Sequence, residues 1–182
     1  MAKTRKILNP VKNKKWKTNF GTLCADGWFS AAPDDLAVNR AIRTNNPGAI
    51  NKSKSKWEVD RPGFVGYTGD DGKGNITTIY QTPEDGVSAW RYLLEKIYKF
   101  QKVGYFDLLA LAQKYSGSTR KKDYQPYLDG WAKWSSGKLK PDTVVHLANL
   151  DEMQALALAE FNHEIGAATP LHAEQITFGL SV

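Results

Sequence analysis

Apolar residues recur every three or four positions over much of the chain after residue 80, which is the spacing of a helix with one buried face. Thr82 is predicted to cap the first of these helices, with Pro83 in its first turn and Gly104 at its end. Further helices are predicted from about Phe106 to Tyr115, Tyr124 to Trp134, Asp151 to Ile165, and from Thr169 onward. The chain is therefore expected to be mainly helical.

The part of the chain before residue 80 follows a different pattern. A short helix is predicted to begin at Pro33 and to stop before Asn45, where an Asn-Asn-Pro-Gly run favours a turn. Alternating apolar and polar residues between Phe64 and Tyr80, interrupted by a Gly-Asp-Asp-Gly segment, indicate a β-hairpin. The expected fold class is mainly α, or α+β, with a small β-hairpin.

Residues 1–32 show no helical or strand periodicity and are interpreted as a basic, irregular N-terminal arm ahead of one domain over residues 33–182. Seven Lys and Arg residues precede the first acidic residue, Asp26, and the formal net charge is +6. The arm is either a solvated tail or a contact for a polyanion. Cys24 is the only cysteine, so no internal disulfide can form, and it has no obvious base to make it a nucleophile.

No segment is apolar enough for a membrane span, and Asn9 and Pro10 interrupt the short apolar stretch that follows the first basic residues. We expect a monomer, made in the cytoplasm without a Sec signal.

The segment from Met153 to Phe161 is apolar on most of its circumference and is expected to lie inside the domain. It carries Glu164 near its end, where Gly166 is predicted to form a left-handed cap. Desolvation, the negative helix end and the nearby Glu160 would all raise the pKa of Glu164. Glu164 is therefore a candidate general acid, and the alternative is a polar helix-end residue that meets water or a lysine.

Several short motifs follow one another in a fixed order along the chain, and together they resemble those of a known family. They are an Arg-x-Asn-Asn-Pro-Gly-x-Ile segment at 43–50, Trp57, the hairpin, a Pro-Glu-x-Gly segment at 83–86 and a His-Glu-x-Gly segment at 163–166. From about residue 40 to 182 the chain resembles phage and bacterial wall-degrading proteins that are similar to lysozyme-like lytic transglycosylases and glucosaminidases. The order of the motifs looks like a circular permutation of the lysozyme-like arrangement.

This resemblance implies a bacteriolytic enzyme, such as an endolysin, that cuts the glycan strands of peptidoglycan after lysis, virion delivery or specialised secretion. Glu164 would protonate the leaving oxygen. The substrate-binding residues would be Tyr80, Gln81, Asn45, Asn46, His163 and Trp57. The alternative for Asn45 and Asn46 is a turn that closes the fold, and the alternative for Tyr80 is a core aromatic. The reaction would be transglycosylation, which needs no second carboxylate, or hydrolysis, for which Asp60, Asp70 and Asp71 are the candidates.

Other chemistries have weaker patterns. A zinc-protease motif would need a second histidine where Ala167 stands, and the turn after Asp70 lacks the ligand spacing of a calcium loop. No metal or cofactor is expected. The main alternative function is a non-catalytic phage structural or adaptor protein that binds a polyanion through its arm, and a wall peptidase is another.

Overall fold

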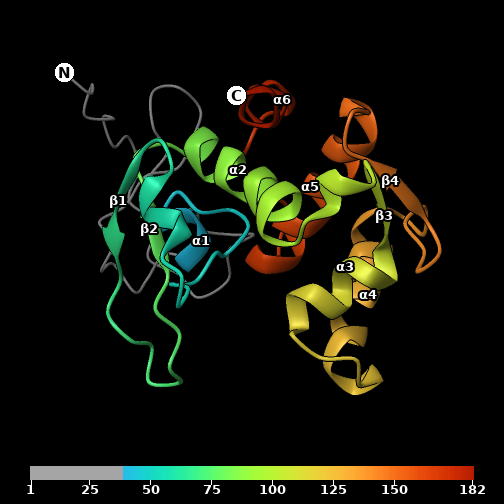
Figure 1. Cartoon of the computed structure of the whole chain (residues 1–182), viewed down its shortest axis with the longest axis horizontal. Helices are drawn as coiled ribbons and strands as arrows, with labels where there is room; N and C mark the ends of the chain where they lie inside the picture. The colour runs from blue at the N-terminus through green and yellow to red at the C-terminus, as the bar shows by residue number, and fades with distance from the viewer. Residues whose placement is uncertain (1–38) are drawn as a thin grey trace.

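The computed structural model describes residues 39–182, which contain six α-helices and two small antiparallel sheets (Figure 1). The strands are β1 (Phe64–Tyr67), β2 (Thr78–Tyr80), β3 (Tyr105–Asp107) and β4 (Val144–His146). The α-helices are α1 (Arg40–Arg43), α2 (Pro83–Tyr92), α3 (Leu108–Ser116), α4 (Lys121–Trp134), α5 (Leu150–Ile165) and α6 (Ala173–Ser181). Short 3-10 helices are η1 (Trp57–Asp60) and η3 (Phe100–Lys102), and η2 (Leu93–Ile97) is a π-helical turn. A mainly α fold with a small hairpin is thus confirmed.

The helix α2 begins as predicted but ends early. The Thr82 side chain accepts a hydrogen bond from the Asp85 amide at 3.1 Å, and the Asp85 carboxylate accepts one from the Thr82 amide. The end predicted at Gly104 is wrong, because α2 passes into η2 and the chain breaks at Lys99, whose φ is 66°. This break lets Phe100 turn back and stack on Phe106 at a ring distance of 4.5 Å. Both aromatic rings are buried where the helix stops.

The predicted hairpin is present and bulged. Strands β1 and β2 are antiparallel, with Phe64 opposite Tyr80 and Tyr67 opposite Thr78, and the register shifts between Phe64 and Gly66. Before it, Asn39 caps α1 by accepting a hydrogen bond from the Ala41 amide. The predicted start of this first helix at Pro33 and the whole basic arm lie outside the described residues, whereas its end before Asn45 is confirmed.

The second sheet was not predicted. Strand β3 pairs with β4, and Tyr105 lies opposite His146. The helix predicted from Phe106 therefore starts two residues later, at Leu108, where the Asp107 carboxylate caps it. Each strand has only three residues, too few for a periodic signal, and the partner is distant in sequence.

The terminal helix also starts later than predicted, at Ala173 rather than at Thr169. The Thr169 amide instead donates a 2.5 Å hydrogen bond to the Asn162 side chain.

Helix α5 forms the centre of the molecule, as its sequence predicts, and packs against α4, α6, α1 and β4. Its residues Met153, Leu156 and Phe161 are fully buried. The Phe161 ring meets Trp90 of α2 edge-on at 5.4 Å. Gly166, with φ 73°, ends α5 in the predicted left-handed cap. Among the described residues, no helix is both long and apolar enough to cross a lipid bilayer.

Candidate active site

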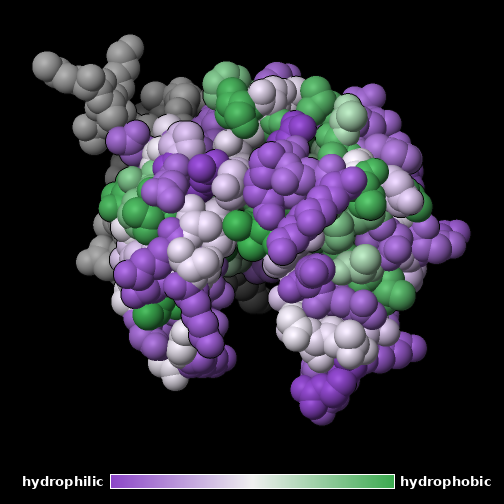
Figure 2. All heavy atoms as spheres, in the orientation of Figure 1, coloured by the Kyte–Doolittle hydropathy of each residue, from purple (hydrophilic) through white to green (hydrophobic). Residues whose placement is uncertain are grey.

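Glu164 lies in the last turn of α5 and lines a cleft of about 400 Å³. One wall comes from α1, the segment 48–57 and the hairpin loop, and the other from η2, α3 and α4. Figure 2 shows the surface hollowed between the side that carries the hairpin and the side that carries α3 and α4. The central helix thus delivers a carboxyl group to the junction of these two sides.

The surroundings of Glu164 favour its protonated form. Burial raises the pKa of Glu164 from its ordinary value of 4.5 to about 7, and the positive charge of Arg40 acts in the opposite direction. Burial has this effect because a carboxylate loses solvation when protein replaces water around it. Near neutral pH this side chain can therefore both give and take a proton.

A second carboxyl group lies one helical turn earlier on α5. Glu160 is 0% exposed, and its carboxyl group accepts a hydrogen bond from the Trp131 indole of α4. Burial, followed by the nearby Glu164, raises the pKa of Glu160 well above its usual range. Glu160 is thus kept neutral inside the protein, and it is not among the residues that line the cleft.

Aromatic side chains supply much of the cleft wall. Trp57 lies on the hairpin side and stacks against Tyr92 at a ring distance of 5.7 Å. On the opposite side, the Tyr115 ring lies 5.9 Å from Tyr98 and 5.5 Å from Tyr127, and all three tyrosines line the cleft. Flat rings with polar edges suit sugars, which combine apolar ring faces with hydroxyl groups.

Asn45 and Asn46, which were predicted to bind substrate, hold the backbone together instead. The Asn46 side chain is fully buried and donates to the carbonyl groups of Ile50 and Thr78, both at 2.9 Å. Asn45 donates to the carbonyl groups of Tyr80 and Gln81. These bonds fix the loop after α1 to strand β2, and neither asparagine is among the lining residues of the cleft.

The other predicted binding residues divide between the cleft and its surroundings. Trp57 lines the cleft. Tyr80 is only 1% exposed and belongs to the core, so in this conformation it is not accessible to a sugar. Gln81 is exposed outside the cleft, and its backbone N–H donates a hydrogen bond to the Gly63 carbonyl at 2.7 Å. His163 packs against Tyr127, and burial lowers its pKa.

Among the candidate second carboxylates, Asp71 does not itself line the cleft but contacts two residues that do. It forms a 2.9 Å ion pair with Arg40 and a hydrogen bond with Asn75, and both of these residues line the cleft. Asp60 and Asp70 are exposed and have no such link to lining residues among the described contacts.

The lining residues that were not predicted include Arg40, Tyr98, Tyr115 and Tyr127. Tyr115 and Tyr127 carried only the spacing of core residues, and Arg40 was one polar position in a short helix.

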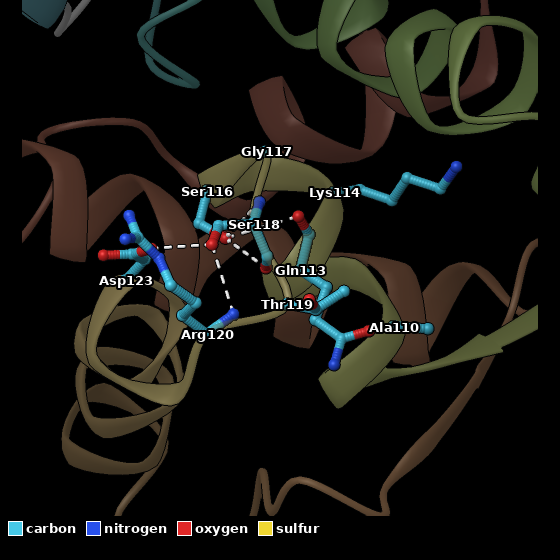
Figure 3. A pocket seen from close by; sticks show the side chains of 9 residues that line it. All are labelled: Ala110, Gln113, Lys114, Ser116, Gly117, Ser118, Thr119, Arg120 and Asp123. Carbon is cyan, nitrogen blue, oxygen red and sulfur yellow. Dashed lines mark hydrogen bonds and ion pairs between the residues drawn. The ribbon is translucent and has the colours of Figure 1, made fainter.

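A larger hollow, of about 1090 Å³, lies at the connection between α3 and α4. Figure 3 shows the side chains of Ser118, Arg120 and Asp123 turned toward one another, whereas Lys114 points away from them. Ser118 donates to the Asp123 carboxylate at 2.6 Å, and Arg120 pairs with the same oxygen at 2.8 Å. The hydrogen bond from Ser118 holds the pKa of Asp123 below its usual range. This hollow therefore has the features of a hydrogen-bonded polar turn before α4 rather than of an acid–base site.

No protein-family model matches the chain, and a search of curated proteins also finds no match. Over residues 39–182, no group of three or more His, Cys, Asp or Glu side chains is arranged to hold a metal ion. The interpretation of the site therefore depends on its own geometry and on the motifs described above.

Proposed function

We propose that this protein cleaves the glycan strands of bacterial peptidoglycan, with Glu164 as its general acid and base. The observation that carries this proposal is a carboxyl group whose pKa is about 7, on the wall of a cleft lined by aromatic rings. The resemblance of residues 40–182 to circularly permuted lysozyme-like wall enzymes supplies the substrate class.

The proposed reaction has two proton transfers. Protonated Glu164 gives its proton to the glycosidic oxygen as the bond from that oxygen to the anomeric carbon breaks. The resulting carboxylate then removes a proton from the attacking hydroxyl group, which belongs either to water or to C6 of the same muramic acid residue. Trp57 and the three tyrosines of the cleft would hold the sugar rings by stacking.

Intramolecular transglycosylation is the version that the cleft favours. Glu164 is the one carboxylate among the described residues that line it. Retaining and inverting hydrolases need a second carboxylate about 5 to 9.5 Å from the acid, whereas attack by the muramic C6 hydroxyl group needs none. Asp71 is not well suited to that role, since its carboxylate already accepts hydrogen bonds from the turn and from Arg40.

The test compares Glu164→Gln with Glu160→Gln on purified peptidoglycan. Loss of the acid is expected to reduce glycan cleavage at least about 100-fold, the usual contribution of a positioned general acid. The control is expected to keep most activity, because glutamine matches the shape of a neutral Glu160 and can still accept the Trp131 hydrogen bond. Mass spectrometry of the fragments distinguishes 1,6-anhydro ends, the product of transglycosylation, from reducing ends.

Two results would count against the proposal. Equal loss of activity in both variants would indicate damage to α5 rather than loss of an acid. Undiminished wall degradation by Glu164→Gln would remove the proposed role of Glu164, and would favour the alternative of a phage structural or adaptor protein that binds a polyanion.

A further inference from the structure

Arg40 is the one positively charged residue among the described residues that line the cleft. It is the first residue of α1, and its side chain is 33% exposed. Within residues 39–182, one hydrogen bond of its guanidinium group is present, from Nη1 to Asp71 Oδ2 at 2.9 Å. The charge is thus accessible from the same cavity as the carboxyl group of Glu164.

Stabilisation of the fold by the ion pair with Asp71 does not explain why Arg40 lies in the cleft. Asp71 is already held by its own turn, since Oδ1 accepts from the amides of Lys73 and Asn75 at 2.9 and 3.1 Å. Its Oδ2 also accepts from the Asn75 side chain at 2.9 Å. A partly exposed ion pair adds about 1 kcal/mol or less to the stability of a fold. The contact serves better to hold the guanidinium group in place.

The charge also opposes the acid. Arg40 lowers the pKa of Glu164, whereas protonation of a leaving oxygen requires that Glu164 keep its proton. An anionic group bound to Arg40 would offset the positive charge while the substrate is in place. A cation at this position is therefore easier to understand as part of substrate recognition than as part of proton transfer.

We infer that Arg40 forms a subsite for a carboxylate group of the substrate, beside Glu164 in the cleft. A guanidinium group is planar and offers five N–H donors, so it can keep Asp71 and also bind a ligand carboxylate. Asp71 shows that a carboxylate fits against this group, at 2.9 Å. The inference rests on the proposed function, which supplies the kind of strand that enters the cleft.

Peptidoglycan offers this chemistry from two sources. The lactyl group of muramic acid ends in a carboxylate when the peptide has been removed, and the stem peptide carries carboxylates when it is present. Oligomers of N-acetylglucosamine have the same backbone without either. These three ligands therefore separate recognition of the charge from recognition of the sugar chain.

The experiment measures binding by calorimetry to full-length Glu164→Gln protein, which should bind strands without cutting them. Three ligands are used: neutral N-acetylglucosamine oligomers, peptide-free glycan strands, and strands whose lactyl groups are amidated by peptides. Arg40→Met is added in the same background. The matched control is Lys52→Met, which removes a positive charge from an exposed residue that adjoins the cleft-lining Asn51 and Ser53.

Arg40→Met is expected to weaken binding of carboxylate-bearing strands about 10- to 100-fold, the range for a hydrogen bond between charged groups. Arg40→Met should change the binding of neutral oligomers less than about twofold. Lys52→Met should change the binding of every ligand less than about twofold, in line with small surface effects. If Arg40→Met weakens only the binding of peptide-free strands, Arg40 binds the lactyl carboxylate. If it weakens only the binding of peptide-bearing strands, Arg40 binds a carboxylate of the stem peptide.

The inference is overturned if Arg40→Met weakens all three ligands equally, if it weakens none, or if no ligand binds. Cleavage is measured separately on wild-type protein, so the two proposals can fail independently. If cleavage depends on Glu164 but Arg40→Met does not change binding, only the proposed carboxylate subsite is contradicted. If binding depends on Arg40 but the wild-type protein cleaves no glycan, only the proposed enzymatic activity is contradicted.

Discussion

Replacing Glu164 with glutamine is expected to stabilise the fold at alkaline pH while it reduces glycan cleavage. In the folded protein the pKa of Glu164 is about 7, whereas its ordinary value is 4.5. The folded state therefore binds a proton more tightly than the unfolded state, and the free energy of unfolding falls as the pH rises from 4.5 to 7. Each pKa unit corresponds to about 1.4 kcal/mol, so the cost reaches about 3 kcal/mol above pH 7.

Glutamine has nearly the shape of a protonated glutamate but cannot ionise. The variant should therefore match the wild-type protein below pH 4.5, become more stable through the interval up to pH 7, and keep a constant advantage above it. Every other titrating group is common to both proteins, but Glu164 also raises the pKa of Glu160, so the difference between the two curves reports the titration of Glu164 together with its effect on Glu160. The expected maximum gain is about 3 kcal/mol at pH 8.

Urea unfolding at several pH values, followed by tryptophan fluorescence, measures this difference directly, since the chain has six tryptophans. The control is Glu174→Gln, at an exposed position of α6, which should change stability by less than about 0.5 kcal/mol. A difference between wild type and Glu164→Gln that is the same at pH 4 and pH 8 would refute the reasoning. It would show that Glu164 is solvated in the folded protein and ordinary in its titration.

Three further predictions address activity and packing. The ratio kcat/KM on soluble glycan strands should fall as the pH rises through about 7, where Glu164 loses its proton, and a pH–rate profile that is flat there would contradict the assignment. Gly86→Ala should destabilise the fold by about 2 kcal/mol or more in thermal unfolding, because the new Cβ would lie 2.1 Å from the Asn45 carbonyl oxygen. Gly69→Ala is the control and should not destabilise the fold, because its new Cβ would have nothing within 4 Å. Asn46→Ala should cost about 2 to 4 kcal/mol in urea unfolding, because it leaves buried backbone groups without partners, and a cost below about 1 kcal/mol would contradict its role.

Local patterns were enough to predict several elements of this fold. The N-cap at Thr82, the alternation that ends at Tyr80 and the left-handed cap at Gly166 all appear as expected. Each depends on residues within a few positions of one another, so their energies are decided locally. The apolar circumference of α5 likewise predicted its place at the centre of the molecule.

Tertiary contacts account for the errors. The early break of the helix after α2 follows from the stacking of Phe100 on Phe106, and strand β3 requires β4 as its partner. Strand β4 lies about 40 residues after β3, outside a window of one helix length. Asn46 was predicted to face substrate, but its bonds to Ile50 and Thr78 turn it into a link between the loop and strand β2.

The sequence by itself determined that α5 is buried and that it carries Glu164 to its end, because helical periodicity and a capping glycine are local properties. Only the tertiary structure decided what surrounds that carboxyl group. Three features require elements far apart in the chain to pack together: the burial of Glu160 against Trp131, the three tyrosines of the cleft and the approach of Arg40. The pKa of an acid depends on the groups that replace water around it, and those groups are brought together by folding.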